Sequence, residues 1–150
     1  MVKHIYQQYN SLKEGEKEYL KLNPHHAIAI KEAKDVAFFE TESRFGINGH
    51  NDKSDAFRHC FWSSMLARDI GYKNALEFTT AHENFPENPE NEKVMDLHNN
   101  KVGIRLGLSM ASNDKLAHYC YTSLLAGRLK VIKKEKKEKK EKKEKKEKKK

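Results

Sequence analysis

The stretch from Asp52 to Gly71 reads DKSDAFRHCFWSSMLARDIG and sets ionisable residues among apolar ones at helical spacing. Asp55 and His59 are four residues apart, so on a helix they share a face with Trp62 and the apolar residues that follow it. A carboxylate and an imidazole on a buried face require polar partners. The stretch therefore predicts a buried helix that contributes Asp55 and His59 to a polar site.

Two further segments carry groups of the same kind. His82 and Glu83 end an apolar helix predicted over residues 73–83, before the loop FPENPENE, whose two prolines stop the helix. A helix predicted over residues 92–106 carries MDLHNNKVG, which places Asp96 between two apolar residues. The same helix carries Asn99, Asn100 and Gly103 one and two turns further on. If these helices meet, carboxylate, imidazole and amide groups converge on one site.

The rest of the chain also shows helical spacing. Further helices are predicted over residues 3–22, from Pro24 to about Ser43, and from about Ser112 to Leu129. The buried side of the second of these is predicted to consist of Ile28, Ala33, Val36, Ala37 and Phe39. No segment alternates strictly between apolar and polar residues with β-branched enrichment, so no strand is predicted. We therefore expect an all-α, compact bundle of five or six helices, one domain over residues 1–132 with its motif core at 45–108.

Helix ends are marked by capping residues. Ser11 and Glu14 have the spacing of a capping box in the first predicted helix. Asp52 or Ser54 is expected to cap the helix that carries Asp55, and Gly71 is expected to end it.

Residues 133–150 are a KKE repeat without an apolar residue, so they cannot pack on a core. This tail holds 13 of the 30 basic and 5 of the 22 acidic side chains, which leaves 17 of each sign in the remainder. The pI of about 9.3 therefore reflects the tail and does not indicate a nucleic-acid-binding face. We expect weak, non-specific contact of the tail with polyanions, the alternative being a solvated tail that binds nothing.

Nothing in the sequence indicates a membrane or secreted protein. The N-terminal residues lack the apolar run of a signal peptide, and nowhere do eighteen apolar residues follow one another. Cys60 and Cys120 lie in apolar helical patterns, where a reduced cysteine acts as a small core residue. We expect a cytoplasmic protein without a transmembrane segment, with export by a route that needs no such signal left open.

The candidate groups match two kinds of chemistry. His59, His82 and Asp96 are the ligand types of one divalent metal, zinc, iron or manganese, and Glu83 would then act as the base for a metal-bound water. Without a metal, His82 and Glu83 would do acid–base work while Asp55 orients His59.

Arg58, in line with Trp62, either holds an anionic substrate or bridges to a carboxylate. Asn99 and Asn100 either belong to the site or hydrogen-bond neighbouring helix ends, and Gly103 is expected to allow close helix approach.

Two functions fit these residues. The first is a hydrolase, metal-assisted and acting on a phosphoester or a similar bond, whose substrate the sequence does not identify. The alternative is a non-enzymatic interaction domain, in which the same His, Asp, Glu and Asn side chains form a buried polar network that fixes helix packing.

The motifs AFRHCFWSSMLARDIGYKNALEFTTAHE and VMDLHNNKVG resemble a small bacterial domain of unknown function whose pattern is FRH, W, AHE, MDLHNN and a glycine. That domain is similar to domains at the C-termini of polymorphic toxins and to short free-standing bacterial proteins, which implies a toxin-type effector. The resemblance covers about residues 45–108. Its matched positions are Arg58, His59, Trp62, His82, Glu83, Asp96, Asn99, Asn100 and Gly103. A fainter likeness is to metal phosphohydrolases with His, His-Asp and Asp on helices, where this chain has His82-Glu83.

Overall fold

The structure, a computed structural model, describes residues 10–132, and in this range the chain forms six α-helices, one short 3-10 helix and no strand. The elements are α2 (Glu14–Leu22), η1 (Pro24–His26), α3 (Ala27–Phe45), α4 (Lys53–Ile70), α5 (Tyr72–Glu83), α6 (Glu90–Gly107) and α7 (Asn113–Leu125). The all-α prediction is confirmed. The KKE repeat at 133–150 and the beginning of the helix predicted at 3–22 lie outside the described residues.

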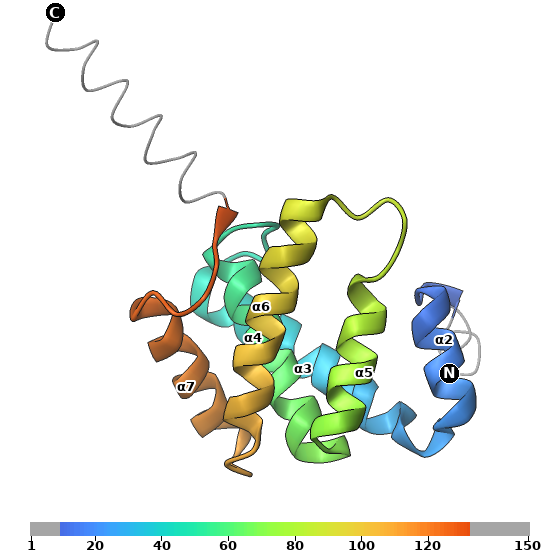
Figure 1. Cartoon of the computed structure of the whole chain (residues 1–150). Coiled ribbons are helices and arrows are strands. Elements are labelled where there is room, and N and C mark those ends of the chain that lie inside the picture. Colours follow the sequence, from blue (N-terminus) through green and yellow to red (C-terminus); the bar gives the residue numbers. More distant parts are fainter. Residues whose placement is uncertain (1–9, 133–150) are drawn as a thin grey trace, which may run out of the picture.

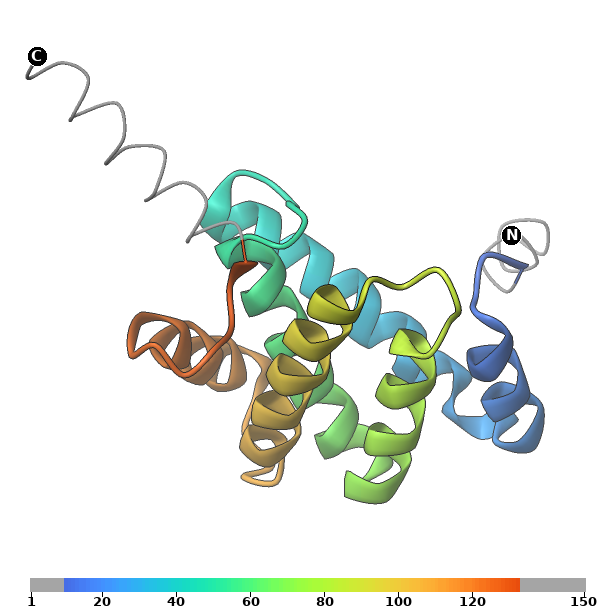
Figure 2. The ribbon, with the colours of Figure 1, turned by 45° about the horizontal axis from the view of Figure 1, so that its top comes forward.

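Helix α4 is the centre of the bundle. It contacts α3, α5, α6 and α7, and its contact with α6 is the most extensive in the structure. In Figures 1 and 2, α2 lies at one end of the molecule and α7 at the other, with α4, α5 and α6 between them and α3 crossing behind. The stretch from Asp52 to Gly71 therefore forms the helix on which α3, α5, α6 and α7 pack.

The sequence of α4 explains its position. Nearly every residue from Ser54 to Ala67 is buried, and Arg58 and His59 are the two that remain partly exposed. The Asp52 carboxylate caps the helix by accepting a hydrogen bond from the Asp55 N–H at 2.9 Å, and the helix ends before Gly71. Both predicted boundaries are confirmed.

Two glycines set the close approach of α6 to α4. A Cβ built on Gly103 would overlap the carbonyl oxygen of Cys60, and one built on Gly107 would overlap the carbonyl oxygen of Ser64. Because these glycines are four residues apart, they lie on one face of α6, and the backbone of α4 packs directly against that face. The predicted role of Gly103 is confirmed.

The predicted buried face of α3 is partly wrong. Ile28 and Phe39 are about three-quarters exposed, at 74% and 75%. The buried residues of α3 are Ile30, Ala33, Ala37 and Thr41. The helix is apolar on more than one side, so spacing alone did not show which stripe faces α4.

Other helix boundaries also differ from prediction. The turn and bend at residues 11–13 precede α2, and Glu16 Oε1 accepts the Lys13 N–H at 2.9 Å, so the predicted Ser11–Glu14 capping box is wrong. The last helix ends at Leu125 and not at Leu129, although Leu129 is still buried against the core.

Among the helices of residues 10–132, none combines the length and the apolar character required to cross a membrane.

Candidate functional site

His59 lies at the centre of a group of carboxylates from three helices. Its Nε2 atom is 3.3 Å from Asp55 Oδ1 and 3.5 Å from Asp96 Oδ1. Its Nδ1 atom is 3.7 Å from Glu83 Oε1. We call Asp55, His59, Glu83 and Asp96 the His59 cluster. The structure therefore brings together four of the predicted site residues, which come from α4, α5 and α6.

Local sequence positions these side chains. Asp55 and His59 lie one turn apart on α4, and Glu83 is the last residue of α5. Asp96 is on α6, which Gly103 brings against α4. The three carboxyl groups are buried, with exposed fractions of 1% for Asp55, 2% for Glu83 and 7% for Asp96. The site thus lies inside the helix packing and is not an addition to the surface.

Asp55 is held in place by the loop that precedes α4. Its Oδ2 atom accepts the Asn51 N–H at 2.7 Å, and its Oδ1 atom accepts Arg58 Nη2 at 2.6 Å. Arg58 also donates to the carbonyl oxygen of Gly49 at 3.0 Å and to Asn48 Oδ1 at 3.3 Å. Of the two roles expected for Arg58, the structure shows the bridge to a carboxylate.

The two asparagines of the MDLHNN motif have different contacts. Asn100 Oδ1 accepts the Ser63 hydroxyl at 3.0 Å and lies 3.2 Å from His59 Nδ1, so Asn100 borders the His59 cluster. Asn99 exchanges two hydrogen bonds with the backbone of Lys130, at 2.9 and 2.8 Å. Asn99 therefore fastens the segment after α7 to α6 and lies outside the site.

The charged groups of the cluster shift one another's pKa values. Burial opposes a charge on the His59 ring, but the hydrogen bond to Asp55 and the negative charges of Asp96, Asp55 and Glu83 outweigh it and raise the pKa of His59 to about 9. Burial also raises the pKa of Asp96, to about 7. The positive charge of His59 acts to lower this pKa, whereas the negative charges of Glu83 and Asp55 raise it further. At neutral pH the site thus holds a positively charged ring beside Asp96, a carboxyl whose pKa is close to that pH.

The pKa of Asp55 is shifted in the opposite direction, below its usual value. Burial would raise the pKa of Asp55, but the hydrogen bond and charge of His59, the Asn51 N–H and the charge of Arg58 lower it. Two neighbouring carboxyl groups in one site therefore have pKa values shifted in opposite directions, which is frequent in sites that move protons.

Two carboxylate oxygens of the cluster lack a hydrogen bond. Among the described residues, Glu83 Oε1 and Asp96 Oδ1 are fully buried atoms without a hydrogen-bond partner. Buried polar atoms are nearly always satisfied in folded proteins, so such an exception calls for a specific explanation. The Glu83 and Asp96 carboxyls adjoin each other, and either a proton shared between them or a bound cation would satisfy these oxygens.

His82 pairs with a residue that the sequence interpretation missed. Its Nδ1 atom lies 3.0 Å from Glu16 Oε2, and its Nε2 atom lies 3.9 Å from Glu83 Oε1. Glu16 comes from α2 and is 4% exposed. Its spacing of three residues from Tyr19 and four from Leu20 puts it on the apolar face of that helix, and this signal could have identified it.

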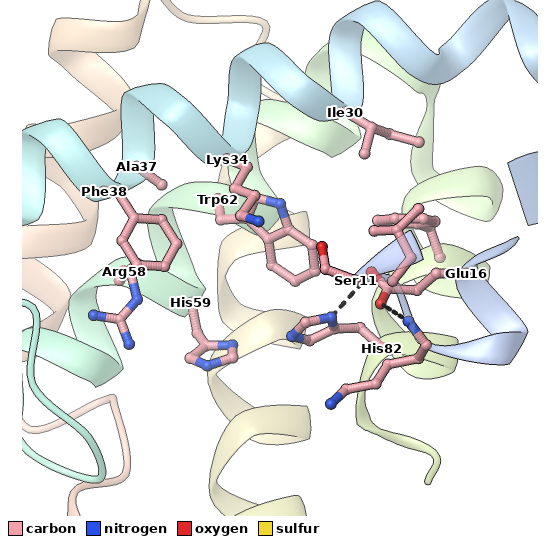
Figure 3. A pocket seen from close by; sticks show the side chains of 13 residues that line it. Ser11, Glu16, Ile30, Lys34, Ala37, Phe38, Arg58, His59, Trp62 and His82 are labelled. Atoms are coloured by element: carbon pink, nitrogen blue, oxygen red, sulfur yellow. Dashed lines mark hydrogen bonds and ion pairs between the residues drawn. The ribbon is translucent and has the colours of Figure 1, made fainter. Parts of the chain in front are cut away.

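A pocket of about 290 Å³ opens beside the cluster. His59 and His82 both line it, and Figure 3 shows their rings below Trp62, with Lys34 and Phe38 on the side of α3. Trp62 packs edge-on against His59 and Phe78, with ring centroids 6.2 and 6.1 Å apart. Of the predicted site residues, Arg58, His59, Trp62 and His82 therefore line a pocket with an aromatic wall.

Three members of the cluster fit a metal ion. One ligand atom each from Asp55, His59 and Asp96 lies within 4.8 Å of the other two. Ligands about 2.1 Å from a tetrahedral ion are about 3.4 Å apart. The distances from His59 Nε2 to Asp55 and Asp96, 3.3 and 3.5 Å, agree with this spacing. A cation would have to displace the proton of His59 Nε2, because a ligand imidazole is neutral at that atom. A nitrogen and two carboxylate oxygens then suit a divalent cation of the zinc, iron or manganese kind.

The predicted ligand His82 lies outside that group of three and on the pocket side of Glu83. Trp62 forms part of the pocket wall.

The sequence matches none of the curated proteins and none of the solved structures with which it was compared. A family model described as a domain of unknown function (DUF6973) matches residues 17–130. The matched range contains all of α3 to α7, and with them the His59 cluster and its histidine neighbour His82. Since the match covers most of the chain, the protein belongs to the DUF6973 family.

Proposed function

We propose that this domain is a hydrolase in which Asp55, His59 and Asp96 hold one divalent cation beside the pocket and Glu83 activates water. The observation that carries the proposal is the pair of buried carboxylate oxygens, Glu83 Oε1 and Asp96 Oδ1, that no hydrogen bond satisfies. This ligand set has Asp55 where the sequence interpretation had His82.

The cation would supply polarisation of the scissile bond and a more acidic bound water. In the hydrolytic step, the water oxygen forms a bond to the electrophilic atom of the substrate while Glu83 Oε1 takes a proton from the water. The ester bond breaks, and its electron pair stays on the leaving oxygen. That oxygen takes a proton from His82 Nε2.

The pairing of His82 with Glu16 supports this assignment. Glu16 Oε2 lies 3.0 Å from Nδ1, which fixes the ring and leaves Nε2 on the side of Glu83. A carboxylate that orients a histidine in this way is a recurring feature of acid–base sites. Because His82 Nε2 and Glu83 Oε1 are 3.9 Å apart, the proton taken by Glu83 returns to His82 through one water and restores the starting state.

Metal content and stability test the ligand set without an assay of activity. Protein purified without chelator is expected to contain one cation per chain by elemental analysis. After the cation has been removed with chelator and the chelator dialysed away, added metal at a hundred times its Kd should stabilise the fold by about 2.7 kcal/mol, visible as a rise in melting temperature. Asp96→Asn should abolish both effects, whereas Asp35→Asn, an exposed carboxylate on α3, should change neither. A wild-type protein that binds no metal would refute the ligand set.

Glu83→Gln tests the base. The substitution preserves shape, so metal content is expected to stay at one per chain while hydrolysis falls at least a hundredfold. Unchanged hydrolysis in this variant would exclude Glu83 as the base.

The alternative is a non-enzymatic domain with a structural polar network, and the contacts of Asp55 favour it. Both Asp55 oxygens already accept hydrogen bonds, from Asn51 and Arg58, and His59 provides a positive charge within the cluster. For a purely structural network, Glu83→Gln should lower stability, because it disturbs a buried charged group. A metal-free protein whose stability falls in Glu83→Gln would establish this reading.

The resemblance to toxin domains extends the proposal to a toxin-type effector. Expression of the wild-type chain in a bacterial host should then inhibit growth, and Glu83→Gln should relieve the inhibition at equal protein level. Equal inhibition by both proteins would separate any toxicity from the proposed chemistry.

A further inference from the structure

We propose that the pocket beside the His59 cluster binds a small phosphomonoester whose ester group is a flat, apolar ring. The inference rests on the proposed function, since it names the substrate class of that site.

The size of the pocket limits the ligand. Its volume of about 290 Å³ is at the lower end of the range for small-molecule sites, which is roughly 300 to 1,000 Å³. A ligand of the size of an aryl phosphate or a mononucleotide fits this space. A folded protein or a nucleic-acid duplex does not enter it.

One wall of the pocket suits a flat ring. Ile30, Phe38, Trp62 and Phe78 contribute apolar surface from α3, α4 and α5. Phe38 is already stacked by the Arg58 guanidinium, which lies 4.9 Å from the ring centroid. Three aromatic side chains around one small cavity favour a planar ligand, because ring-to-ring contacts add to the area that is buried.

The remaining lining holds several cationic groups and one carboxylate, that of Glu16, which is paired with His82. Lys13 and Lys34 line the pocket together with His59 and His82, and Figure 3 shows Lys34 on α3 close to Trp62. The Lys13 ammonium lies over the Phe85 ring, 4.0 Å from its centroid, while Arg58 is paired with Asp55 and His82 with Glu16. Among the described residues, Lys34 forms no ion pair. Lys34 is also exposed, so its charge is available to a ligand.

The two kinds of lining specify the two halves of the ligand. An anionic head placed between Lys34 and the histidines comes next to the His59 cluster, where the proposed water and base are found. The flat group then lies against Trp62 and Phe38. A phosphomonoester combines these features, since its phosphate is doubly charged near neutral pH and accepts several hydrogen bonds.

Trp62 provides a direct probe, because it is the one tryptophan in the sequence and lines the pocket. The full chain is titrated at constant pH, in chelator, with phenyl phosphate, benzyl alcohol and inorganic phosphate, and the Trp62 emission is recorded. Phenyl phosphate should change the emission saturably, with a Kd at least tenfold below that of benzyl alcohol or of inorganic phosphate.

Two lysine variants identify the anion contact. Lys34→Gln should raise the Kd for phenyl phosphate about fivefold and leave that for benzyl alcohol unchanged, as expected for loss of one exposed charge contact. Lys31→Gln makes the same change in net charge on the same helix, outside the pocket lining, and should leave both constants unchanged.

The inference is overturned if phenyl phosphate leaves the emission unchanged at millimolar concentration, or if benzyl alcohol binds as tightly. Equal weakening by Lys31→Gln and Lys34→Gln also overturns it, because the effect would then be one of overall charge. Binding of phenyl phosphate by a protein that takes up no metal supports the inference and refutes the proposed ligand set alone. Metal uptake without phenyl phosphate binding refutes the inference alone.

Discussion

Gly103→Ala tests the contact on which the site depends. A Cβ at this position would overlap the Cys60 carbonyl oxygen and lie 2.9 Å from its carbonyl carbon and 3.0 Å from its Cα. The Cys60 oxygen is the closest of the three atoms, and ordinary van der Waals contact with a Cβ begins at 3.4 Å, so α6 must move away from α4 by more than about 1 Å. The obstacle is backbone, which has no alternative rotamer to adopt.

The size of the effect follows from two opposing contributions. Overpacking of a core costs about 1–3 kcal/mol, and a backbone clash belongs at the upper end, near 3 kcal/mol. Replacing glycine by alanine within a helix stabilises the helix by about 1 kcal/mol, which opposes this cost. The net destabilisation is therefore about 2 kcal/mol, or a fall in melting temperature of about 8 °C for a domain of this size.

Thermal and urea unfolding, followed by circular dichroism, measure this change. Lys101→Ala, at an exposed position of the same helix, is the matched control and should melt within about 0.5 kcal/mol of the wild type. Because Asp96 is on α6 and His59 on α4, the separation of the helices should also weaken the metal uptake proposed above. A Gly103→Ala protein that melts at or above the wild-type temperature would refute the close contact.

Three further outcomes are expected. Asn99→Ala should lower the urea midpoint by the equivalent of about 1–3 kcal/mol, because it removes both hydrogen bonds to the backbone after α7; an unchanged midpoint would contradict this. Burial would raise the pKa of Glu16, but its hydrogen bond and charge interaction with His82 lower it, so the native state gains stability that is present above about pH 4.5 and lost as the pH falls through the lowered value. The melting temperature of wild type minus that of Glu16→Gln should accordingly shrink from pH 6 to pH 3, and a constant difference would count against the pairing. Burial raises the pKa of Cys60 and both thiols are buried, so Cys60 and Cys120 should react with Ellman's reagent after unfolding but not in the native protein.

Local features of the sequence were sufficient for the helices and for most of the cluster. The periodicity of residues 53–70, the capping Asp52 and the following Gly71 define α4 without reference to any distant residue. Asp55 and His59 are on one face of it because their spacing is four residues. The third and fourth members, Glu83 and Asp96, were recognisable as ionisable groups set in apolar helices.

The tertiary structure decided which of these groups meet, because a helical pattern fixes a face but not the neighbour across it. His82 pairs with Glu16, 66 residues away, and Asn99 binds the backbone 31 residues further on. Neither pairing leaves a signal at short range, so the partner of His82 was not predicted and the two asparagines could not be told apart. Which stripe of α3 is buried was likewise settled by packing, which leaves Phe39 in solvent since α4 approaches from the opposite side of that helix.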